Sequence, residues 1–435
     1  MSKKIIVVGC GVMGLSTVVH LAERGDYEIT AMDAYEVPSP WSAANDINKI
    51  IRSEYKEFVY TKLSVEATRQ WRTDPIFEGV YKECGRILMT PLHHQGRQKY
   101  EKESIMNLRK IGNEGRKIEN LQGGHALRDK FEMLENNRVH DNEVARWNPE
   151  AGLAHSANAL RAMYEKAKSL GVKFIFGEAG RIIKVEERNQ KHYVLAANGT
   201  LYTADQIVLS AGASSGYIVD LKQQQAATGL FVTHIQLTYD EYERFKNMPI
   251  VFDAEMGYFF PPDPETRVLK IALPGSGASN FVKDPFDGRK AKSLPRYKQQ
   301  NPSDTIPRSS ISQVQKLLEK YVPELAHHTI FNSKSCWIAD TYDSHFIIDQ
   351  VPGSKNLFVA TGDSGHAFKF LPNIGKYIVL RLENRLDAEL KELWRWKDET
   401  RAFDSTSLDW RVGTDSLDFS EIKWAEENGM LRCSL

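Results

Sequence analysis

The sequence predicts an α/β chain, α+β overall, in which a parallel-sheet unit alternates along the chain with a unit built on a mixed or antiparallel sheet. Two observations predict this fold class. Apolar runs lead into glycine-rich turns near both ends, at 5–14 and 357–365, and such runs are typical of strands buried on both faces. Between them, residues 230–275 alternate apolar and polar side chains, which indicates an antiparallel sheet.

The first element is a strand at Ile5–Val8, followed by glycines in the spacing G-x-G-x-x-G. Gly9 allows a tight turn, Gly11 lets the backbone approach a phosphate, and Gly14 lets the next helix pack against the strand. A second strand ends at Asp33, nineteen residues after Gly14, where a carboxylate can accept hydrogen bonds from ribose hydroxyls. This order predicts a dinucleotide site; a glycine-rich turn in an unrelated α/β protein is the alternative.

The later elements extend the same two units. Asn198 and Gly199 form a hairpin signal before a buried strand at 206–210, and "SSISQVQKLLEKYVPEL" reads as an amphipathic helix. Nucleotide-type patterns thus recur at the start, middle and end of the chain, with antiparallel material between them. We therefore expect a nucleotide-binding unit in segments 1–85, 146–220 and 326–395, a substrate unit in segments 86–145 and 221–325, and a surface tail at 396–435.

Composition and charge exclude several partners. The chain has 57 Lys and Arg against 57 Asp and Glu, so its net charge predicts neither a nucleic-acid nor a membrane partner. No apolar run approaches the length of about 18 residues that a spanning helix needs. The scattered cysteines at 10, 84, 336 and 433 are typical of free thiols in a reducing compartment.

The C-terminus weakly resembles a peroxisomal address. Cys433 and Leu435 fit the small–basic–leucine pattern, whereas Ser434 replaces the basic residue. A frayed tail is the alternative. We expect a peroxisomal or cytoplasmic location.

A second glycine-rich turn indicates which dinucleotide binds. A buried strand runs into Gly362, Asp363 and Gly365 before a helix, so backbone amides there can face an anion. A flavin needs such groups near its pyrimidine carbonyl, because the reduced ring carries negative charge. The turn therefore favours FAD over NAD.

With these motifs in place, the sequence resembles the family of FAD-dependent amine oxidases that includes monomeric sarcosine oxidase, pipecolate oxidase, saccharopine oxidase and the fructosyl amino acid oxidases (amadoriases). The resemblance covers nearly the whole chain and leans toward the fungal fructosyl amino acid and saccharopine oxidases. It implies a Rossmann-like FAD-binding domain interleaved with a substrate domain, in the D-amino-acid-oxidase-like arrangement of glutathione-reductase-2 type. The motifs, in family order, are "VVGCGVMGLSTVVHLAERG", "SAANDINKIIRSEY", "IVLSAGASS", "LKIALPG", "CWIADTYDSHFIID" and "GDSGHAFKFLPNIGKYI".

The resemblance implies a covalent flavin. The family joins a cysteine at the position of Cys336 to the flavin 8α-methyl group through its sulfur. From the residues alone, a buried core cysteine or half of a disulfide are the alternatives. The cofactor contacts that the resemblance implies are Gly9, Gly11, Val12, Met13, Gly14, Asp33, Ser42, Asn48, Lys49, Gly212, Cys336, Asp363, Gly365, His366, Phe368 and Lys369.

The resemblance also implies catalytic cations. Lys270 would face the flavin and stabilise negative charge during the reaction with oxygen; a solvated strand lysine is the alternative. Arg52 and Lys369 would hold the substrate carboxylate, for which a guanidinium fork is well suited. A structural ion pair is the alternative for each of them.

Three further residues are expected to line the substrate site by analogy. Phe259 and Phe260 match aromatic residues that flank the substrate in relatives, although a core strand explains them equally well. His366 would line the flavin or substrate side, and a packed core histidine is the alternative. No metal site is expected.

The sequence departs from the fructosyl amino acid oxidases in two places. Those enzymes carry an acidic pair shortly after the oxygen-reactive lysine, where this chain reads Ala272, Leu273, Pro274 and Gly275. Ile338 stands where many amadoriases have a second cysteine. A fructosyl substrate is therefore in doubt.

The expected reaction converts the secondary amine of an N-substituted L-amino acid to an imine that hydrolyses, while O₂ is reduced to H₂O₂. Saccharopine is the first choice of substrate, a fructosyl amino acid the second, and pipecolate or sarcosine the third. We expect a monomer. An NAD(P)-dependent dehydrogenase and a catalytically silent binding protein are the competing classes.

Overall fold

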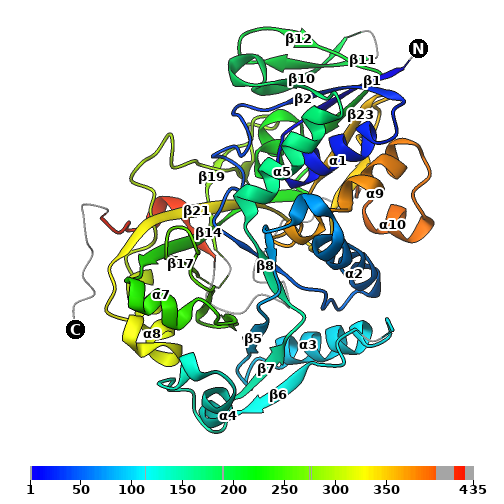
Figure 1. The fold of residues 1–435 in the computed structure, drawn as a ribbon. Helices are drawn as coiled ribbons and strands as arrows, with labels where there is room; N and C mark the ends of the chain where they lie inside the picture. The colour runs from blue at the N-terminus through cyan, green and yellow to red at the C-terminus, as the bar shows by residue number, and fades with distance from the viewer. Residues whose placement is uncertain are drawn as a thin grey trace.

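A computed structural model describes residues 2–112, 114–188, 191–273, 275, 277–397 and 416–426. Figure 1 shows a unit with α1, α5, α9 and α10 at the upper right and a second unit, with β14, β17 and β21, at the lower left. Across these ranges, no helix combines the length and the apolar character that crossing a bilayer requires.

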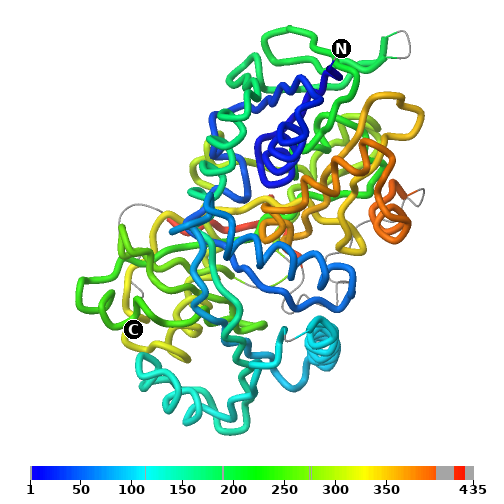
Figure 2. The backbone as a smooth tube through the Cα atoms, turned by 45° about the vertical axis from the view of Figure 1, so that its right-hand side comes forward, coloured from blue at the N-terminus to red at the C-terminus, as the bar shows by residue number. Residues whose placement is uncertain are grey.

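One sheet has six strands, and four of its five pairings are parallel. The edge strand β22 is antiparallel to β23. Strands from the start, middle and end of the chain lie side by side here, as the blue, green and orange segments of Figure 2 show. The strands in spatial order are β22 (Ile347–Gln350), β23 (Leu357–Thr361), β13 (Gln206–Leu209), β1 (Lys3–Val8), β2 (Tyr27–Met32) and β9 (Lys173–Ile175).

Both faces of this sheet are covered, which explains its continuous apolar runs. Ile5 and Val7 join a core cluster with residues of α1 and α9, whereas Ile6 and Val8 join a different cluster on the other face. The helices of the chain are α1 (Val12–Ala22), α2 (Phe58–Thr73), α3 (Gln95–Leu108), α4 (Gly123–Lys130), α5 (Ser156–Ser169), α6 (Ser215–Ile218), α7 (Tyr239–Phe245), α8 (Ser310–Tyr321), α9 (Ile374–Leu382) and α10 (Ala388–Leu393).

The second sheet has ten strands and is mostly antiparallel. Its centre is the long pair β14 and β21, which run side by side over most of their length. The strands in spatial order are β24 (Leu417–Asp418), β18 (Ala278–Ser279), β14 (Gln225–Gln236), β17 (Val268–Ala272), β16 (Gly257–Phe259), β15 (Ile250–Asp253), β5 (Arg86–Met89), β7 (Val144–Asn148) and β6 (Glu119–Gln122), with β21 (Ile330–Thr341) paired to β14.

Three small sheets complete the described fold. Their strands are β10 (Ile182–Arg188), β11 (Lys191–Ala196) and β12 (Leu201–Tyr202); β3 (Lys49–Ile51), β8 (Gly152–Ala154) and β4 (Tyr81–Lys82); and β19 (Phe281–Lys283) with β20 (Ala291–Ser293). The hairpin expected at Asn198–Gly199 joins β11 to β12, and Gly199 has the positive φ of 85° that such a turn requires.

The ten-stranded sheet buries different side chains on its two faces. One face packs against α8, whose apolar stripe of Val314, Leu317 and Leu318 joins the core cluster of that unit. On the other face, Val232, Ala272 and Cys336 form a small cluster with Tyr258 packed against it. This second face supplies side chains to the cavity described below.

The described fold confirms the predicted class and refines the segments. We expected the substrate unit to end at residue 325 and the nucleotide-binding unit to resume at 326. However, β21, which follows this boundary, pairs with β14 in the large sheet of the substrate unit. The expected surface tail also differs in its described part, because Phe419 and Ala425 are buried in the core of that unit. The division into six segments otherwise stays a prediction.

Candidate active site

A cavity opens between the two units. Segments from both of them line it: the glycine turn after β1, the end of β2, the start of β3, strands β14, β17 and β21, and the turn after β23. The predicted residues that line it are Gly9, Gly11, Val12, Met13, Asp33, Ser42, Lys49, Gly212, Lys270, Cys336, Asp363, Gly365 and Phe368. Gly14, Asn48, Arg52, Phe259, Phe260, His366 and Lys369 are outside this lining.

At two positions of the glycine turn, Gly9 and Gly14, neighbouring backbone lies too close for a side chain. Gly9 has a φ of +98°, and a Cβ atom there would lie 2.4 Å from the Ser210 carbonyl oxygen. A Cβ atom on Gly14 would lie 1.8 Å from the Gly9 carbonyl oxygen, so α1 can pack against β1 only with glycine at this position. At Gly11 the nearest atom is Ser42 Oγ at 3.5 Å, so the space beside Gly11 remains open.

This open space fits a pyrophosphate. Helix α1 begins at Val12 without a side-chain cap, so its first N–H groups remain available at the cavity. Asp33 is held at the end of β2 because its Oδ2 accepts a hydrogen bond of 2.7 Å from the Cys10 backbone N–H. Trp41 also lines the cavity, and its Nε1 has no hydrogen-bond partner within the described residues. The donors and the acid match the predicted dinucleotide.

A buried carboxylate, that of Asp46, joins two lysines that line the cavity. Asp46 Oδ2 lies 2.5 Å from Lys270 Nζ and 2.8 Å from Lys49 Nζ. Lys270 Nζ also donates a 2.7 Å hydrogen bond to the Asn48 carbonyl oxygen. Lys270 is 1% exposed, so the solvated strand lysine that was the alternative is wrong. Asn48 thus positions Lys270 through its backbone, and its buried side-chain Oδ1 has no hydrogen-bond partner among the residues that the structure describes.

The two lysines differ in their titration. Burial, partly offset by Asp46, lowers the pKa of Lys270 to about 8. Burial alone would lower the pKa of Lys49 too, but the Asp46 carboxylate raises it above its usual value. Burial would raise the pKa of Asp46, and the Lys270 and Lys49 ammonium groups instead hold it well below its usual range. Lys270 is therefore a cation that can lose its proton near neutral pH.

Sequence reasoning missed Asp46 and Tyr258. The one signal in the sequence for Asp46 is that it stands three residues before Lys49, a spacing at which the two side chains can form an ion pair. Tyr258 was passed over in favour of the next two aromatic residues. Strand alternation could have separated these candidates, because Tyr258 lines the cavity and Phe259 does not.

Phe259 and Phe260 have other surroundings. Phe259 is fully buried in the core cluster on the α8 side, 6.3 Å from the Tyr321 ring. The centre of the Phe260 ring lies 4.9 Å from Lys270 Nζ, so the face of the ring lies against the ammonium group. Their predicted contact with substrate stays a prediction.

Cys336 lies on β21 at the cavity, and the residue as a whole is 9% exposed. Among the residues that the structure describes, Cys10, Cys84 and Cys336 are all free, so none of these three forms a disulfide with another. Cys433 is outside the described ranges, together with the tripeptide read as a peroxisomal address.

A second group of predicted residues gathers around Tyr55, which follows β3. The Arg52 guanidinium carbon is 4.7 Å from the Tyr55 ring centre, and Lys369 Nζ is 5.4 Å from it. The Tyr55 hydroxyl lies 3.2 Å from His366 Nδ1, and Lys369 Nζ donates a 2.7 Å hydrogen bond to the His366 carbonyl oxygen. Arg52, Lys369 and His366 therefore form one cluster.

This cluster is short of negative charge. Burial and the nearby Arg52 guanidinium lower the pKa of Lys369 well below its usual value. Burial and the Lys369 ammonium likewise hold the pKa of His366 well below its usual value, which makes His366 neutral. A carboxylate that entered here would restore the proton on Lys369.

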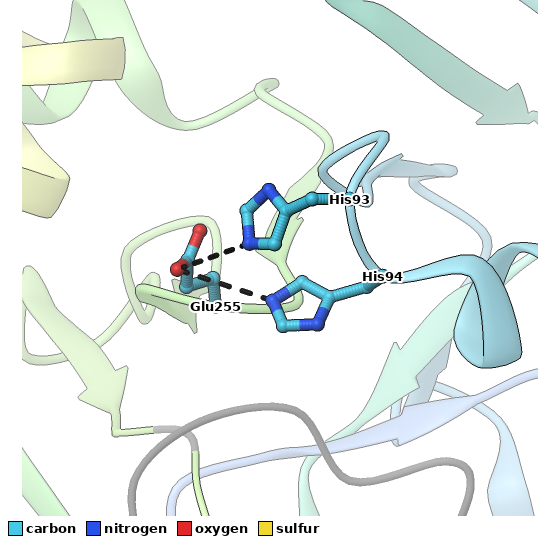
Figure 3. Close-up of side chains that lie close together, drawn as sticks. All are labelled: His93, His94 and Glu255. Atoms are coloured by element: carbon cyan, nitrogen blue, oxygen red, sulfur yellow. Dashed lines mark ion pairs between the residues drawn. The ribbon is translucent and has the colours of Figure 1, made fainter.

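Possible metal ligands lie elsewhere. In Figure 3, His93 and His94 point toward Glu255, with Nε2–Oε1 distances of 3.7 and 3.9 Å. Glu241, His327 and His328 form a second such group. None of these residues lines the cavity.

The cavity and the two interleaved sheets define an oxidoreductase that binds FAD. The chain belongs to the FAD dependent oxidoreductase (DAO) family, whose profile matches residues 4–381. This confirms the predicted family and fold class, and FAD as the cofactor.

Particular relatives narrow the class. L-saccharopine oxidase of Schizosaccharomyces pombe is 41% identical over 98% of this chain and 99% of that protein. Monomeric sarcosine oxidase of a Bacillus species is 24% identical over 86% of this chain and 90% of that protein. The structure of fructosyl peptide oxidase from E. terrenum matches with a TM-score of 0.88 and 31% identity, covering 98% of each chain.

The substitution Asp46→Asn should destabilise the protein by about 3–5 kcal/mol, because it leaves two buried ammonium groups without their carboxylate. Urea unfolding measures this free energy. Glu178→Gln is the matched control, since Glu178 pairs with Arg181 at the surface and its loss should leave the free energy of unfolding nearly unchanged. Equal stability of both variants would show that the pairs around Asp46 do not hold the units together.

Proposed function

We propose that this chain oxidises the secondary amine of an N-substituted L-amino acid, with saccharopine as its substrate. The observation that carries the proposal is the buried group of Arg52 and Lys369 beside Tyr55, which has the charge to hold a substrate carboxylate. The 41% identity to a saccharopine oxidase over nearly the full length of both proteins supports the choice of substrate.

The chain would act first by positioning. The Arg52 guanidinium offers a planar fork to a carboxylate, and Lys369 becomes a full cation once that carboxylate is bound. Fixing the carboxylate at one end of the substrate orients the carbon next to the amine toward the cavity. Such orientation supplies a large share of a rate enhancement.

FAD, when bound, accepts the two electrons and the hydrogen that the amine carbon loses and passes them to O₂, which forms H₂O₂. Water hydrolyses the resulting imine to a carbonyl compound and a free amine. Lys270 provides a fixed ammonium group at the cavity, where negative charge develops during the reaction with oxygen. Asp46 holds that ammonium group in place.

Cys336 is proposed to tether the flavin. Cys336 would hold the flavin by a thioether bond from its sulfur to the 8α-methyl carbon; forming that bond removes one hydrogen from the thiol and one from the methyl group, and O₂ would be the acceptor of both. The position of Cys336 in the cavity lining and the absence of a bond to Cys10 or Cys84 support this.

A fructosyl amino acid is the second candidate substrate. The TM-score of 0.88 with a fructosyl peptide oxidase favours it. The apolar stretch at Ala272 and Leu273, in place of the acidic pair expected of such enzymes, argues against it, and both side chains line the cavity. Pipecolate and sarcosine come third.

Two further proposals concern the protein in the cell. We propose that it is a monomer and that it is peroxisomal or cytoplasmic. The monomeric sarcosine oxidase among its relatives supports the first, and the C-terminal tripeptide supports the peroxisome.

Anaerobic mixing should identify the substrate. Saccharopine should bleach the flavin absorbance faster than fructosyl-lysine, fructosyl-valine, pipecolate, sarcosine or proline, because its carboxylates match the buried cations. Spectrophotometry without oxygen measures the reduction directly. Bleaching by none of these amines would overturn the proposed substrate class, and bleaching by fructosyl-valine alone would establish the second candidate.

Acid precipitation should leave the yellow colour with the protein. Cys336→Ala should release the flavin into the supernatant, because the alanine side chain has no sulfur to carry the bond. Cys84→Ala serves as the control, since Cys84 does not line the cavity and should keep the colour in the pellet. A white pellet from the wild-type protein would rule out the covalent bond between Cys336 and the flavin.

Reoxidation of the substrate-reduced enzyme by O₂ should slow as the pH rises through about 8, where the Lys270 ammonium loses its proton. Stopped-flow mixing with oxygen across the alkaline range measures this rate. Lys270→Met should be about 10²-fold slower and should show no step near that pH. A wild-type step that persists in Lys270→Met would assign it to another group.

A further inference from the structure

A group of buried and half-buried positive side chains continues beyond Arg52, away from the cavity. Two strands of the large sheet and helix α3 supply its side chains, with Arg86 on β5, Arg146 on β7, and Arg97 on α3. Figure 1 shows these three elements next to one another in the lower part of the molecule. Nothing in the proposed reaction so far uses these arginines.

The charges in this group do not balance. Glu54 pairs with Arg86 at 3.0 Å, and Glu101 pairs with Arg97 and Arg146 at 2.7 Å each. Among the described residues, the guanidinium groups of Arg52, Arg86, Arg97 and Arg146 stand against the two carboxylates of Glu54 and Glu101, and Lys369 becomes a full cation only once an anion binds. Burying an excess of like charge costs free energy unless an anion enters.

Arg86 carries a buried donor that an anion could accept. Its side chain is 5% exposed, and its Nε has no hydrogen-bond partner among the residues that the structure describes. Burial, together with the nearby Arg52 and Arg97, lowers the pKa of Arg86 to about 10. A buried guanidinium donor without an acceptor is costly, and a carboxylate is the acceptor that matches its geometry.

The arginines are connected to the cavity through two stacked rings. Tyr258 lines the cavity and stacks on Phe252 at 4.7 Å. The guanidinium carbons of Arg86 and Arg97 each lie 5.9 Å from the Phe252 ring. On the other side, β3 leads from Lys49 at the cavity to Arg52. A substrate held at Arg52 therefore has the second cationic group beside it.

We propose that Arg86, beside Arg97, receives a second carboxylate of the substrate, so that this site selects dicarboxylate amines. This rests on the proposed function, because the first carboxylate is assigned to Arg52 and Lys369. Saccharopine meets the requirement, since it joins the side-chain nitrogen of lysine to a glutarate-type dicarboxylate. Sarcosine and pipecolate, with a single carboxylate each, do not.

Binding of non-reacting ligands to the holoenzyme tests the proposal without turnover. Glutarate and valerate have the same chain length and differ by one carboxylate. Calorimetric titration should give a Kd for glutarate at least about tenfold lower than that for valerate. Arg86→Lys should abolish most of this preference, because an ammonium group cannot replace the fork, and should leave valerate binding unchanged.

Arg381→Lys is the matched control, because it makes the same change in another guanidinium–carboxylate pair, with Asp349, in the parallel-sheet unit. It should keep the full preference for glutarate. Wild-type protein without a preference, or Arg86→Lys with an unchanged preference, would overturn the proposal.

Glu54→Gln tests the same site by removing the carboxylate that pairs with Arg86 instead of the arginine itself. This variant tests the proposal if Arg86→Lys does not fold. Removing the competing carboxylate should tighten glutarate binding more than valerate binding; unchanged or weaker glutarate binding would overturn the proposal. The flavin-bleaching screen distinguishes failure of the proposed amine oxidation from failure of the second carboxylate site. A preference for glutarate without bleaching by saccharopine would remove the proposed function and leave the subsite.

Discussion

The pairing of Asp46 with Lys270 connects the two units of the molecule. Lys270 belongs to β17 of the large sheet, whereas Asp46 precedes the short strand β3. The Asp46 backbone carbonyl also accepts a 2.7 Å hydrogen bond from the Ser156 hydroxyl at the start of α5. A buried carboxylate between two ammonium groups is stable only when all three are held in place. These contacts fix the Asp46 segment against both β17 and α5, beside the cavity that Lys270 and Lys49 line.

The same segment organises the charges on the substrate side. From Asp46 to Glu54 the chain passes Lys49, which lines the cavity, and then leads through β3 to the arginine group. Lys270 thereby faces the place where oxygen would react, and Arg52 faces the place where a carboxylate would bind. One continuous stretch of backbone couples these two sites, so a shift of β3 would move both.

The fold was largely predictable from the sequence. The spacing of Gly9, Gly11 and Gly14 predicted the turn, and the structure shows that Gly9 and Gly14 have no room for a Cβ atom whereas Gly11 leaves open space. The strand at 206–209 and the helix at 310–321 also appeared where their apolar patterns placed them. The pairing of β21 with β14 was not predictable, because strands distant in sequence choose partners through sheet register.

The candidate site was predictable in its residue types but not in its contacts. Lys270, Cys336 and Arg52 came from motifs, and the structure places the first two at the cavity and the third in the adjoining cluster. Asp46 carries no motif of its own, and it mattered only once folding placed it against two lysines. The same holds for Arg86, whose unpartnered Nε is a property of its burial.

The sequence by itself determined the cofactor class and the family. Glycine spacing and the order of motifs along the chain can be read from the sequence without knowing how the strands pair. Only the tertiary structure decided which charges face one another. The pKa of Lys270 and the surplus of cations around Arg86 arise from burial and from neighbours distant along the chain. Electrostatic energies depend on distances that no single segment contains.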